Sequence, residues 1–491
     1  MATGGAVEET VAFPDWVVLD RYGRTYCHDD LDNRLEFVTG TGHRCCLSFT
    51  LLDPPKLSYI DIHCPLEGSA KPEPPYRFPA YPYLRATHED LVLFEISLPS
   101  QTCFDGDPSD LFVYTVAGPS PSVQRLPLYT EPREWPFLRS RKNTGILRLA
   151  GDRYIVADLR VYWKKKEGSD NYSVLAELCV FNSMTEKWEL FLEMPAPQPQ
   201  DQGNGGLFPI LWTTKDVLAF DDRFLCWVDY LSGVLLCDFT DAASPVLNFV
   251  PFPGGQDYPD KRHIAMGLAN YYRRLSISQG MMRFIDIDRG YQERVHVGWR
   301  QRLERGQGQQ EPHLLKITIW TLKVMGAVGD PRFEWEVHRV INLDCLWAQR
   351  GYQALGMRPC LPEFPVVPAD DPDALCCLLR DEKLLINRQL YGHCDADARA
   401  QPWMIMVDMN HAYLRSCAEY INQQPYGRPN ESVNAKAVKV HEHFFSNTLL
   451  LPAVFSKYLE TPKVITQDDN KQLKINPSKR VKLTTHPPER V

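Results

Sequence analysis

The sequence lacks the segments that carry a protein into or across a membrane. No run of about 18 apolar residues occurs in the 491-residue chain, so we predict no membrane-spanning helix. The first residues, MATGGAVEETVAF, contain neither a basic stretch nor a long apolar one, unlike a secretory signal. We therefore expect an intracellular protein, in the cytoplasm, the nucleus or both. The 14 cysteines would then be small buried side chains rather than disulfides.

Several catalytic signatures are also absent. The chain contains no Gly-X-Ser-X-Gly elbow, no P-loop and no His-Glu-X-X-His pair. Two cysteine pairs, Cys45-Cys46 and Cys376-Cys377, are adjacent rather than spaced as Cys-X-X-Cys. Neighbouring strand residues point to opposite faces, so neither pair is placed to chelate a metal. We predict no cofactor and no bound metal.

The net charge and the numbers of proline and glycine further limit the class of protein. A net charge of −8 makes nucleic-acid binding by the whole folded domain unexpected. The 39 prolines outnumber the 29 glycines, which disfavours long helices and favours many turns.

Short apolar stretches bounded by Gly, Pro, Asp or Asn are what the sequence has in abundance. The segment DRFLCWVDYLSGVLLCDF (222–239) and the segment 178–191 both have the pattern of a strand, a polar turn and a strand. Such pairs cannot bury both faces alone, but a closed ring of sheets can. We therefore predict an all-β fold with a few short helices, a β-propeller-like ring of antiparallel hairpin blades, with Trp227 packed between blades. An open pair of sandwiches is the alternative.

The pattern also suggests how the chain is organised. We expect a disordered N-terminus over 1–12, a single β-propeller-like domain over 13–460 and a disordered basic tail over 461–491. Weak helical patterns occur at four places: 265–274, 342–352, 411–424 and 448–459. A hairpin is expected over 403–414, which competes with the third of these helices.

Five segments carry a family resemblance: FPDWVVLD (13–20), LFVYTVAGPSPS (111–122), GILRLAGDRYIVADLR (145–160), CWVDYLSGVLLCD (226–238) and FVPFP (249–253). They resemble the plant domain-of-unknown-function family 1618 (DUF1618), which is expanded in grasses. The Trp-Val-Asp hairpin is the most specific of them. The second half of the chain is similar mainly in its style of strands and turns.

This resemblance implies a fold similar to the propeller-like domains that follow F-boxes in plant proteins. It implies no activity and supplies no catalytic residues, because the family has none assigned. An F-box needs a helical stretch ahead of the domain, whereas strand-like sequence begins here at Phe13. We therefore expect that this chain lacks the F-box adaptor.

Two pairs of residues could carry chemistry. Asp286 and Asp288 alternate along a predicted strand, so both carboxylates would share one face and could share a metal or a proton. His441 and His443 place two imidazoles in the same way. Zinc needs three or four ligands, and no nearby His or Cys completes this second set. Solvated strand-end side chains explain both pairs more simply.

Two basic stretches could bind a partner. The loop at Lys164–Lys166 lies beside aromatic residues and could touch phosphate, but a charged hairpin loop explains it more simply. In the tail, Lys479, Arg480 and Lys482 resemble a nuclear localisation signal, which would bind an importin. A solvated basic tail is the alternative.

These patterns favour a non-enzymatic interaction module that binds a protein partner. Propeller loops can vary without harming the core, which suits such a role. One alternative is a hydrolase-like enzyme with its site at the channel mouth, where Asp286, Asp288, His441 and His443 would be the first residues to test. The other is a nuclear regulator with weak nucleic-acid contact through the basic tail.

Overall fold

The computed structural model of the protein describes residues 13–27, 35–40, 42–64, 82–97, 109–117, 120–129, 142–165, 168, 172–195, 212–241, 244–253, 269, 271–288, 315–327, 330–357, 359–380, 403–420 and 450–459. The predicted disordered termini, 1–12 and 461–491, lie outside the described residues. Among the described residues, no helix has the length and apolar character needed to span a membrane.

Five of the six described sheets are meanders of four antiparallel strands in sequence order. Their strands are β6 (Pro82–His88), β7 (Leu91–Ser97), β8 (Ser109–Thr115) and β9 (Ser122–Arg125); β10 (Thr144–Arg148), β11 (Tyr154–Lys165), β12 (Tyr172–Asn182) and β13 (Lys187–Pro195); β14 (Asp216–Phe220), β15 (Phe224–Asp229), β16 (Gly233–Asp238) and β17 (Val246–Pro251); β18 (Arg273–Ser278), β19 (Met281–Ile287), β20 (Lys316–Ala327) and β21 (Asp330–Asn342); and β22 (Glu363–Val366), β23 (Ala374–Leu379), β24 (Trp403–Asp408) and β25 (Tyr413–Glu419).

The sixth sheet, which we call the closing sheet, combines both ends of the described chain. Its strand order is β26-β1-β5-β4-β3, with β2 also paired to β5. The C-terminal strand β26 is antiparallel to the N-terminal strand β1, while β1 and β2 both run parallel to β5. The strands are β1 (Val17–Asp20), β2 (Arg24–Cys27), β3 (Leu35–Val38), β4 (Arg44–Thr50), β5 (Leu57–Cys64) and β26 (Leu450–Ala453).

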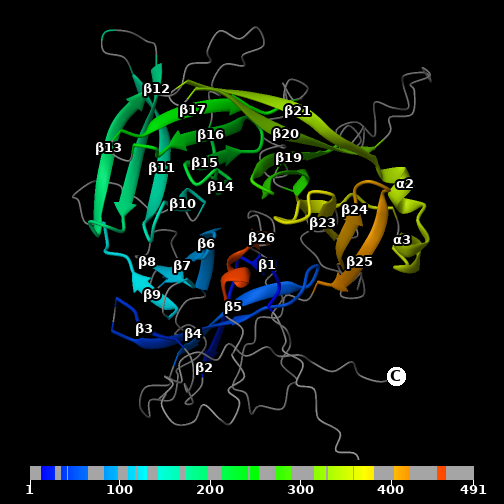
Figure 1. Ribbon diagram of the computed structural model, residues 1–491, viewed down its shortest axis with the longest axis horizontal. Helices are drawn as coiled ribbons and strands as arrows, with labels where there is room; N and C mark the ends of the chain where they lie inside the picture. Colours follow the sequence, from blue (N-terminus) through cyan, green and yellow to red (C-terminus); the bar gives the residue numbers. More distant parts are fainter. Residues whose placement is uncertain are drawn as a thin grey trace, which may run out of the picture.

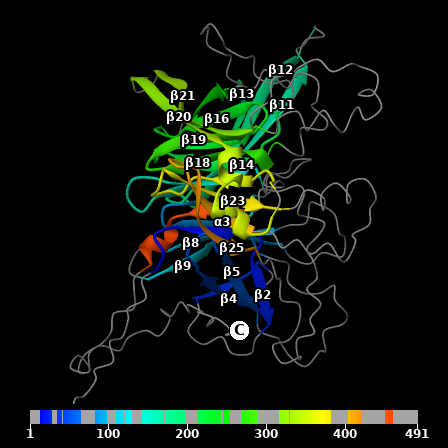
Figure 2. The same ribbon diagram turned by 90° about the vertical axis from the view of Figure 1, so that its right-hand side faces the viewer.

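The six sheets stand around a common centre, which is the arrangement of a six-bladed β-propeller (Figure 1). The first strands of the meanders are innermost, because β10 contacts both β6 and β14, and β18 contacts β22. Figure 2 shows the ring turned by 90°, with the short 3-10 helix η4 (Phe455–Tyr458), coloured orange-red, on one of its two faces. The predicted all-β ring is confirmed, and the open pair of sandwiches is wrong.

Burial along each strand follows its place in the blade. All six residues of β15 are buried, because this strand lies between two neighbours in its sheet and between adjacent blades. The edge strand β13 instead alternates between exposed and partly buried positions. Trp227 in β15 is 0% exposed and packs against Leu147 and Ile155 of the preceding blade. The prediction that Trp227 lies between blades is confirmed.

The adjacent cysteine pairs are buried within strands, as the sequence predicts. Cys45 and Cys46 lie in β4, and Cys376 and Cys377 lie in β23; each is exposed by 1% or less. Burial raises the pKa of the Cys376 thiol to about 12. The Cys376 thiol therefore stays protonated, and all four buried cysteines act as small apolar side chains.

Two of the four helix predictions need correction. The prediction over 342–352 is confirmed by α2 (Leu343–Trp347) and α3 (Arg350–Ala354). The stretch 411–424 is not helical where it is described, because β25 occupies Tyr413–Glu419 and pairs with β24 as the competing hairpin prediction requires. Ala269, Tyr271 and Tyr272 are helical, but Arg273 and Arg274 belong to strand β18, which corrects the end of the prediction over 265–274. The prediction over 448–459 is confirmed in part, because β26 is followed by the 3-10 helix η4. Cross-strand pairing outweighed a weak helical pattern at both corrected sites.

Candidate functional site

Polar side chains gather at both ends of the propeller axis. The innermost strands β6, β10 and β14 run in the same direction, so they begin together at one end and finish together at the other. At their far end lies the acidic rim, which consists of His88, Glu89, Asp90, Asp221 and Asp222. At their near end lies the axial cluster, which consists of Arg21, Arg85, Glu95, Thr144, Asp158, Asp216, Tyr230 and Arg274.

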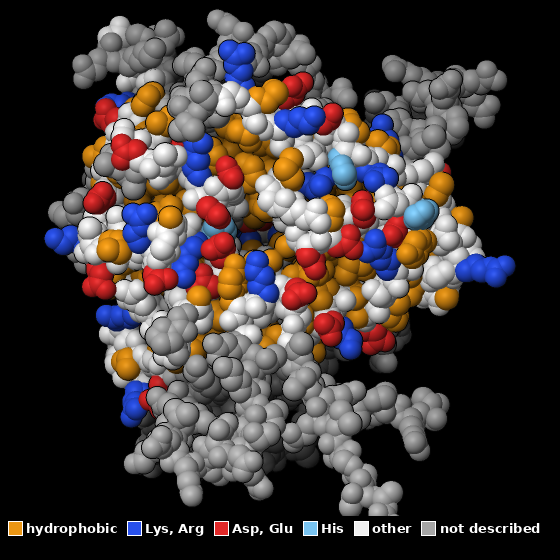
Figure 3. Space-filling view, in the orientation of Figure 1, with side chains coloured by type: hydrophobic (Ala, Val, Ile, Leu, Met, Phe, Trp, Pro, Cys, Tyr) orange, Lys and Arg blue, Asp and Glu red, His pale blue; other side chains and the backbone are white. Residues whose placement is uncertain are grey.

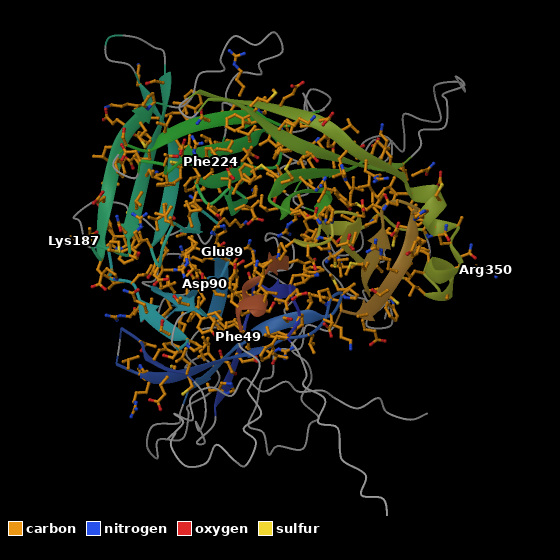
Figure 4. All side chains as sticks on the ribbon, viewed as in Figure 1. Phe49, Glu89, Asp90, Lys187, Phe224 and Arg350 are labelled. Atoms are coloured by element: carbon orange, nitrogen blue, oxygen red, sulfur yellow. The ribbon has the colours of Figure 1, made fainter. Side chains whose placement is uncertain are left out.

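The acidic rim is built on two tight turns. Glu89 joins β6 to β7 with φ of 48°, and Asp221 and Asp222 join β14 to β15 with φ of 56° and 45°. Positive φ is uncommon for residues other than glycine, and such backbone strain often occurs at binding sites. The turns hold these acidic side chains in fixed positions on one face of the ring. Figure 4 shows Glu89 and Asp90 next to the centre of the ring.

His88 connects the two turns as a neutral imidazole. Its Nδ1 accepts a hydrogen bond from the Arg148 backbone N–H at 2.9 Å, so Nε2 carries the proton. Nε2 lies 3.5 Å from Asp222 Oδ1. Burial lowers the pKa of His88 to about 4, even though Asp222 acts to raise it. The imidazole therefore adds no positive charge to the rim at neutral pH.

The carboxylates of the rim have different surroundings. Asp90 is buried and accepts a hydrogen bond from Arg148 Nη2 at 2.6 Å, so its charge is balanced. Burial raises the pKa of Glu89, with further contributions from Asp222 and Asp90, while Lys457 on η4 opposes the shift. Acidic side chains thus repel one another across this mouth. The space-filling view shows Asp and Glu side chains around a hollow near the middle of the face (Figure 3).

The axial cluster at the other end is buried and centred on Asp216. Arg21 Nη2 donates to Asp216 Oδ1 at 2.6 Å, and Arg274 Nη2 lies 3.5 Å from Oδ2. Arg21 also donates to the backbone carbonyls of Leu84 and Arg85 in β6. These contacts join the segment after β1 to three different blades. Buried ion pairs of this kind fix which groups lie opposite one another.

A second set of buried contacts extends the axial cluster. Arg85 donates to Glu95 Oε2 from Nε at 2.8 Å and from Nη2 at 2.5 Å. It also donates to Thr144 in the next blade, and Thr144 in turn donates to Asp158 at 2.8 Å. Each of these four side chains has a hydrogen-bond partner within the set, which favours a structural role for this part of the cluster.

The structure gives the two residues of the candidate acidic pair different surroundings. Arg273 donates to Asp286 from Nε at 3.1 Å and from Nη2 at 3.0 Å, so Asp286 is committed to an ion pair in its own sheet. Asp288 follows β19, and its backbone N–H donates to the Lys316 carbonyl at 2.8 Å. His441 and His443 lie outside the described residues. Within the described ranges, no group of three or more His, Cys, Asp or Glu side chains is placed to hold a metal ion.

The basic candidates are only partly described. Lys164 lies on β11 and pairs with Glu193 at 2.5 Å, with both side chains more than half exposed. The charged hairpin explains this residue without a nucleic-acid partner. Lys166 and the tail residues Lys479, Arg480 and Lys482 lie outside the described residues, so the localisation signal stays a prediction.

Sequence reasoning missed both the acidic rim and the axial cluster. The only local sign of the rim was acidic residues at two strand ends, His88-Glu89-Asp90 and Asp221-Asp222. The partners Arg21 and Asp216 are 195 positions apart, so no spacing rule could join them. The two residues come into contact only when the ring of blades has formed.

The strand pairing defines the protein as a six-bladed β-propeller whose ring is closed by strands from both ends of the described chain. Residues 227–376 match the family described as "Protein of unknown function (DUF1618)". The match confirms the predicted resemblance, but it begins within the fourth quoted segment and extends to residue 376, into the second half of the chain, which had been compared only in style. The comparison with curated proteins found no match.

One similar solved structure is described as the β-propeller domain of the Trilobed protease from Pyrococcus furiosus, with an open velcro topology. The likeness covers 70% of this chain and 86% of that chain at 9% identity, with a TM-score of 0.27. At that similarity the fold assignment rests on the strand pairing itself.

Proposed function

We propose that the protein is a non-catalytic docking module whose acidic rim binds a Lys- or Arg-rich segment of a protein partner. The observation that carries the proposal is the placement of Glu89 next to the centre of the ring, where burial and Asp222, close by on the turn of another blade, raise the pKa of Glu89. Asp222 is 71% exposed on its side chain, and among the described residues its ion-pair contact is with the neutral His88. Among the described residues, neither carboxylate has a Lys or Arg partner within ion-pair distance.

A rigid acidic mouth suits a basic partner for two physical reasons. Complementary charge raises the rate of encounter and disfavours acidic competitors. The tight turns hold the carboxylates in place before binding, so little conformational freedom is lost when the partner docks. The family match is compatible with this role because its description carries no activity.

The test compares two double variants that remove the same charge. Glu89→Gln/Asp222→Asn removes two of the four carboxylates of the rim, and Asn tolerates the positive φ of position 222 better than most residues. Glu189→Gln/Glu334→Gln removes two exposed acids from the outer strands β13 and β21. The probe is a fluorescent peptide of alternating Arg and Ser, with a Gln-Ser peptide as the neutral control.

We expect the rim variant to weaken binding of the basic peptide by about tenfold or more, while the outer variant stays near wild type. Binding should fall as salt is raised. The same titration without residues 461–491 removes competition from the tail, which has seven Lys or Arg and three acidic residues. Equal weakening in both double variants would show a non-specific charge effect and reject the rim as the docking site.

A second experiment tests the biological partner. The tagged wild-type, rim-variant and outer-variant proteins are purified from the source tissue, each with and without residues 461–491. A partner that requires the rim should be lost from the rim variant alone. Loss of importins on removal of Lys479, Arg480 and Lys482 with the tail would support the nuclear signal. A partner set unchanged in all forms would contradict both proposals.

A further inference from the structure

Arg274 of β18 is a buried cation whose hydrogen-bonding groups are not all used. Its side chain is 1% exposed. Nη2 contacts Asp216 and donates to the Leu450 carbonyl of β26. Nε and Nη1 have no hydrogen-bond partner among the described residues. A guanidinium group carries five N–H donors, and buried donors are rarely left unpaired, so these atoms indicate a missing acceptor.

The charge around Arg274 also lacks balance. Arg21 and Arg274 share the single carboxylate of Asp216. Glu95 is already occupied by Arg85, at 2.5 Å. Burying a cation without a matching anion is strongly unfavourable. The described residues around Asp216 therefore provide one carboxylate for two guanidinium groups.

Two lysines lie at the same end of the axis. Lys142 precedes β10 and Lys215 precedes β14, and both are partly buried. The two strands approach closely, because a Cβ at Gly145 would lie 2.4 Å from Val217 Cγ1. Burial lowers the pKa of Lys142 to about 8, with Lys215 and Arg21 acting in the same direction and Asp216 opposing them. Burial also lowers the pKa of Lys215, against the effect of Asp229.

We propose that this end of the propeller axis binds a phosphate-class anion, held by Arg274 and Arg21 and approached past Lys142 and Lys215. Guanidinium groups hydrogen-bond well to phosphate oxygens, and ammonium groups add charge without a fixed geometry. The four side chains come from the segment after β1, the starts of β10 and β14, and β18. The bound anion would therefore tie four blades together. The acidic rim lies at the opposite end, so this site is independent of the proposed docking function.

The test measures the melting temperature of the full-length protein in inorganic phosphate and in sodium chloride of equal ionic strength. The site variant is Lys142→Gln/Lys215→Gln, which changes two partly exposed residues and should leave the fold intact in chloride. The control is Lys187→Gln/Lys323→Gln, which removes two exposed lysines from β13 and β20. Lys187 lies at the outer edge of the ring (Figure 4).

We expect phosphate to raise the melting temperature of the wild type and the control. The site variant should need about tenfold or more phosphate to reach the same rise. If an anion stays bound through purification, native mass spectrometry of protein purified without phosphate should detect it. The added mass distinguishes inorganic phosphate from a phosphate ester.

Two results would overturn the proposal. One is a site variant whose phosphate dependence equals that of the wild type. The other is a wild type that shows neither a phosphate-dependent melting temperature nor a bound anion in the mass spectrum.

Discussion

The blade formed by β14–β17 and the closing sheet solve the same packing problem in opposite ways. The first takes all its strands from residues 216–251, and each strand pairs with its neighbour in sequence. In the closing sheet, Val17 pairs with Ala453 and Asp20 pairs with Leu450. A local meander forms with little loop-closure entropy, whereas pairing the two chain ends requires the rest of the ring to be nearly in place.

The closing sheet also joins its neighbour through backbone hydrogen bonds. Between β1 and β2 the chain pairs with β6: Gly23 N–H donates to Pro82 O at 2.9 Å, and Leu84 N–H donates to Arg21 O at 2.8 Å. A Cβ at Gly23 would lie 2.4 Å from Ile60 Cγ2, so only glycine fits. One short N-terminal segment thus contacts β26, β5 and β6. The ring should open here first, while the local blades stay formed.

The largest expected effect comes from removing the closing strand. A chain ending at residue 449 loses β26 and η4, including the buried Leu450, Leu451 and Phe455, and it removes the carbonyl that Arg274 contacts. We expect destabilisation of more than about 5 kcal/mol, which is comparable with the whole stability of many domains. Urea unfolding followed by tryptophan fluorescence measures it.

The matched control for this truncation is a chain ending at residue 459, which keeps both elements. It should unfold at nearly the same urea concentration as the full-length protein. If the chain ending at 449 were equally stable, the pairing of β26 with β1 would not be what closes the ring.

A smaller but still large loss is expected from Trp227→Ala in the local blade. The indole is fully buried, and its Nε1 donates to the Asn143 carbonyl of the preceding blade at 2.6 Å. Truncation should lower the free energy of unfolding by about 3–5 kcal/mol, since it leaves a cavity and removes the hydrogen bond from the indole to the Asn143 carbonyl. Thermal unfolding measures the loss, with Trp163→Ala as control because that side chain is 39% exposed. Equal effects of the two substitutions would show that Trp227 contributes no more to stability than a partly exposed tryptophan does.

The difference between the two regions also explains what sequence alone could predict. The hairpin β15–β16 was predicted because its apolar runs and Ser232-Gly233 turn lie within 18 residues. Its position between two blades was predicted because an apolar strand that contains a tryptophan must be buried on both faces. The closing sheet could not be predicted, because VVLD (17–20) and LLPA (450–453) are ordinary strand sequences with no mark that pairs them.

The same limit applies to the candidate sites. Asp286 was selected for its spacing from Asp288, yet the structure commits it to Arg273 on the neighbouring strand. Asp222 drew no attention as part of a hairpin turn, and it lies at the axis only because the ring brings it near His88 of another blade. Alternation along one strand is visible in sequence, but contact between blades depends on the closure of the ring.

The smallest expected effect distinguishes the two regions by the sign of their pH dependence. Burial raises the pKa of Asp20, in the closing sheet, from 3.8 to about 7, against a hydrogen bond from Tyr22 N–H and the charge of Arg24. A carboxyl whose pKa is higher in the folded state favours folding when protonated, and this contribution is lost as pH rises from about 4 through about 7. Asn at this position keeps the acceptor for Tyr22 N–H, at 2.9 Å, without the charge.

Asp20→Asn should therefore raise the free energy of unfolding at about pH 8, by at most about 4 kcal/mol, and change it little at about pH 4. Asp238 of β16 gives the contrast: burial acts to raise its pKa, but hydrogen bonds from Arg223 and Thr240 outweigh this and lower it. Asp238→Asn should destabilise the protein at neutral pH, and the effect should fade as pH falls through the acidic range. Urea unfolding across this pH range measures both variants. Parallel pH profiles for the two would mean that Asp20 is ionised in the folded protein as readily as Asp238, and that the closing sheet admits more water than its burial indicates.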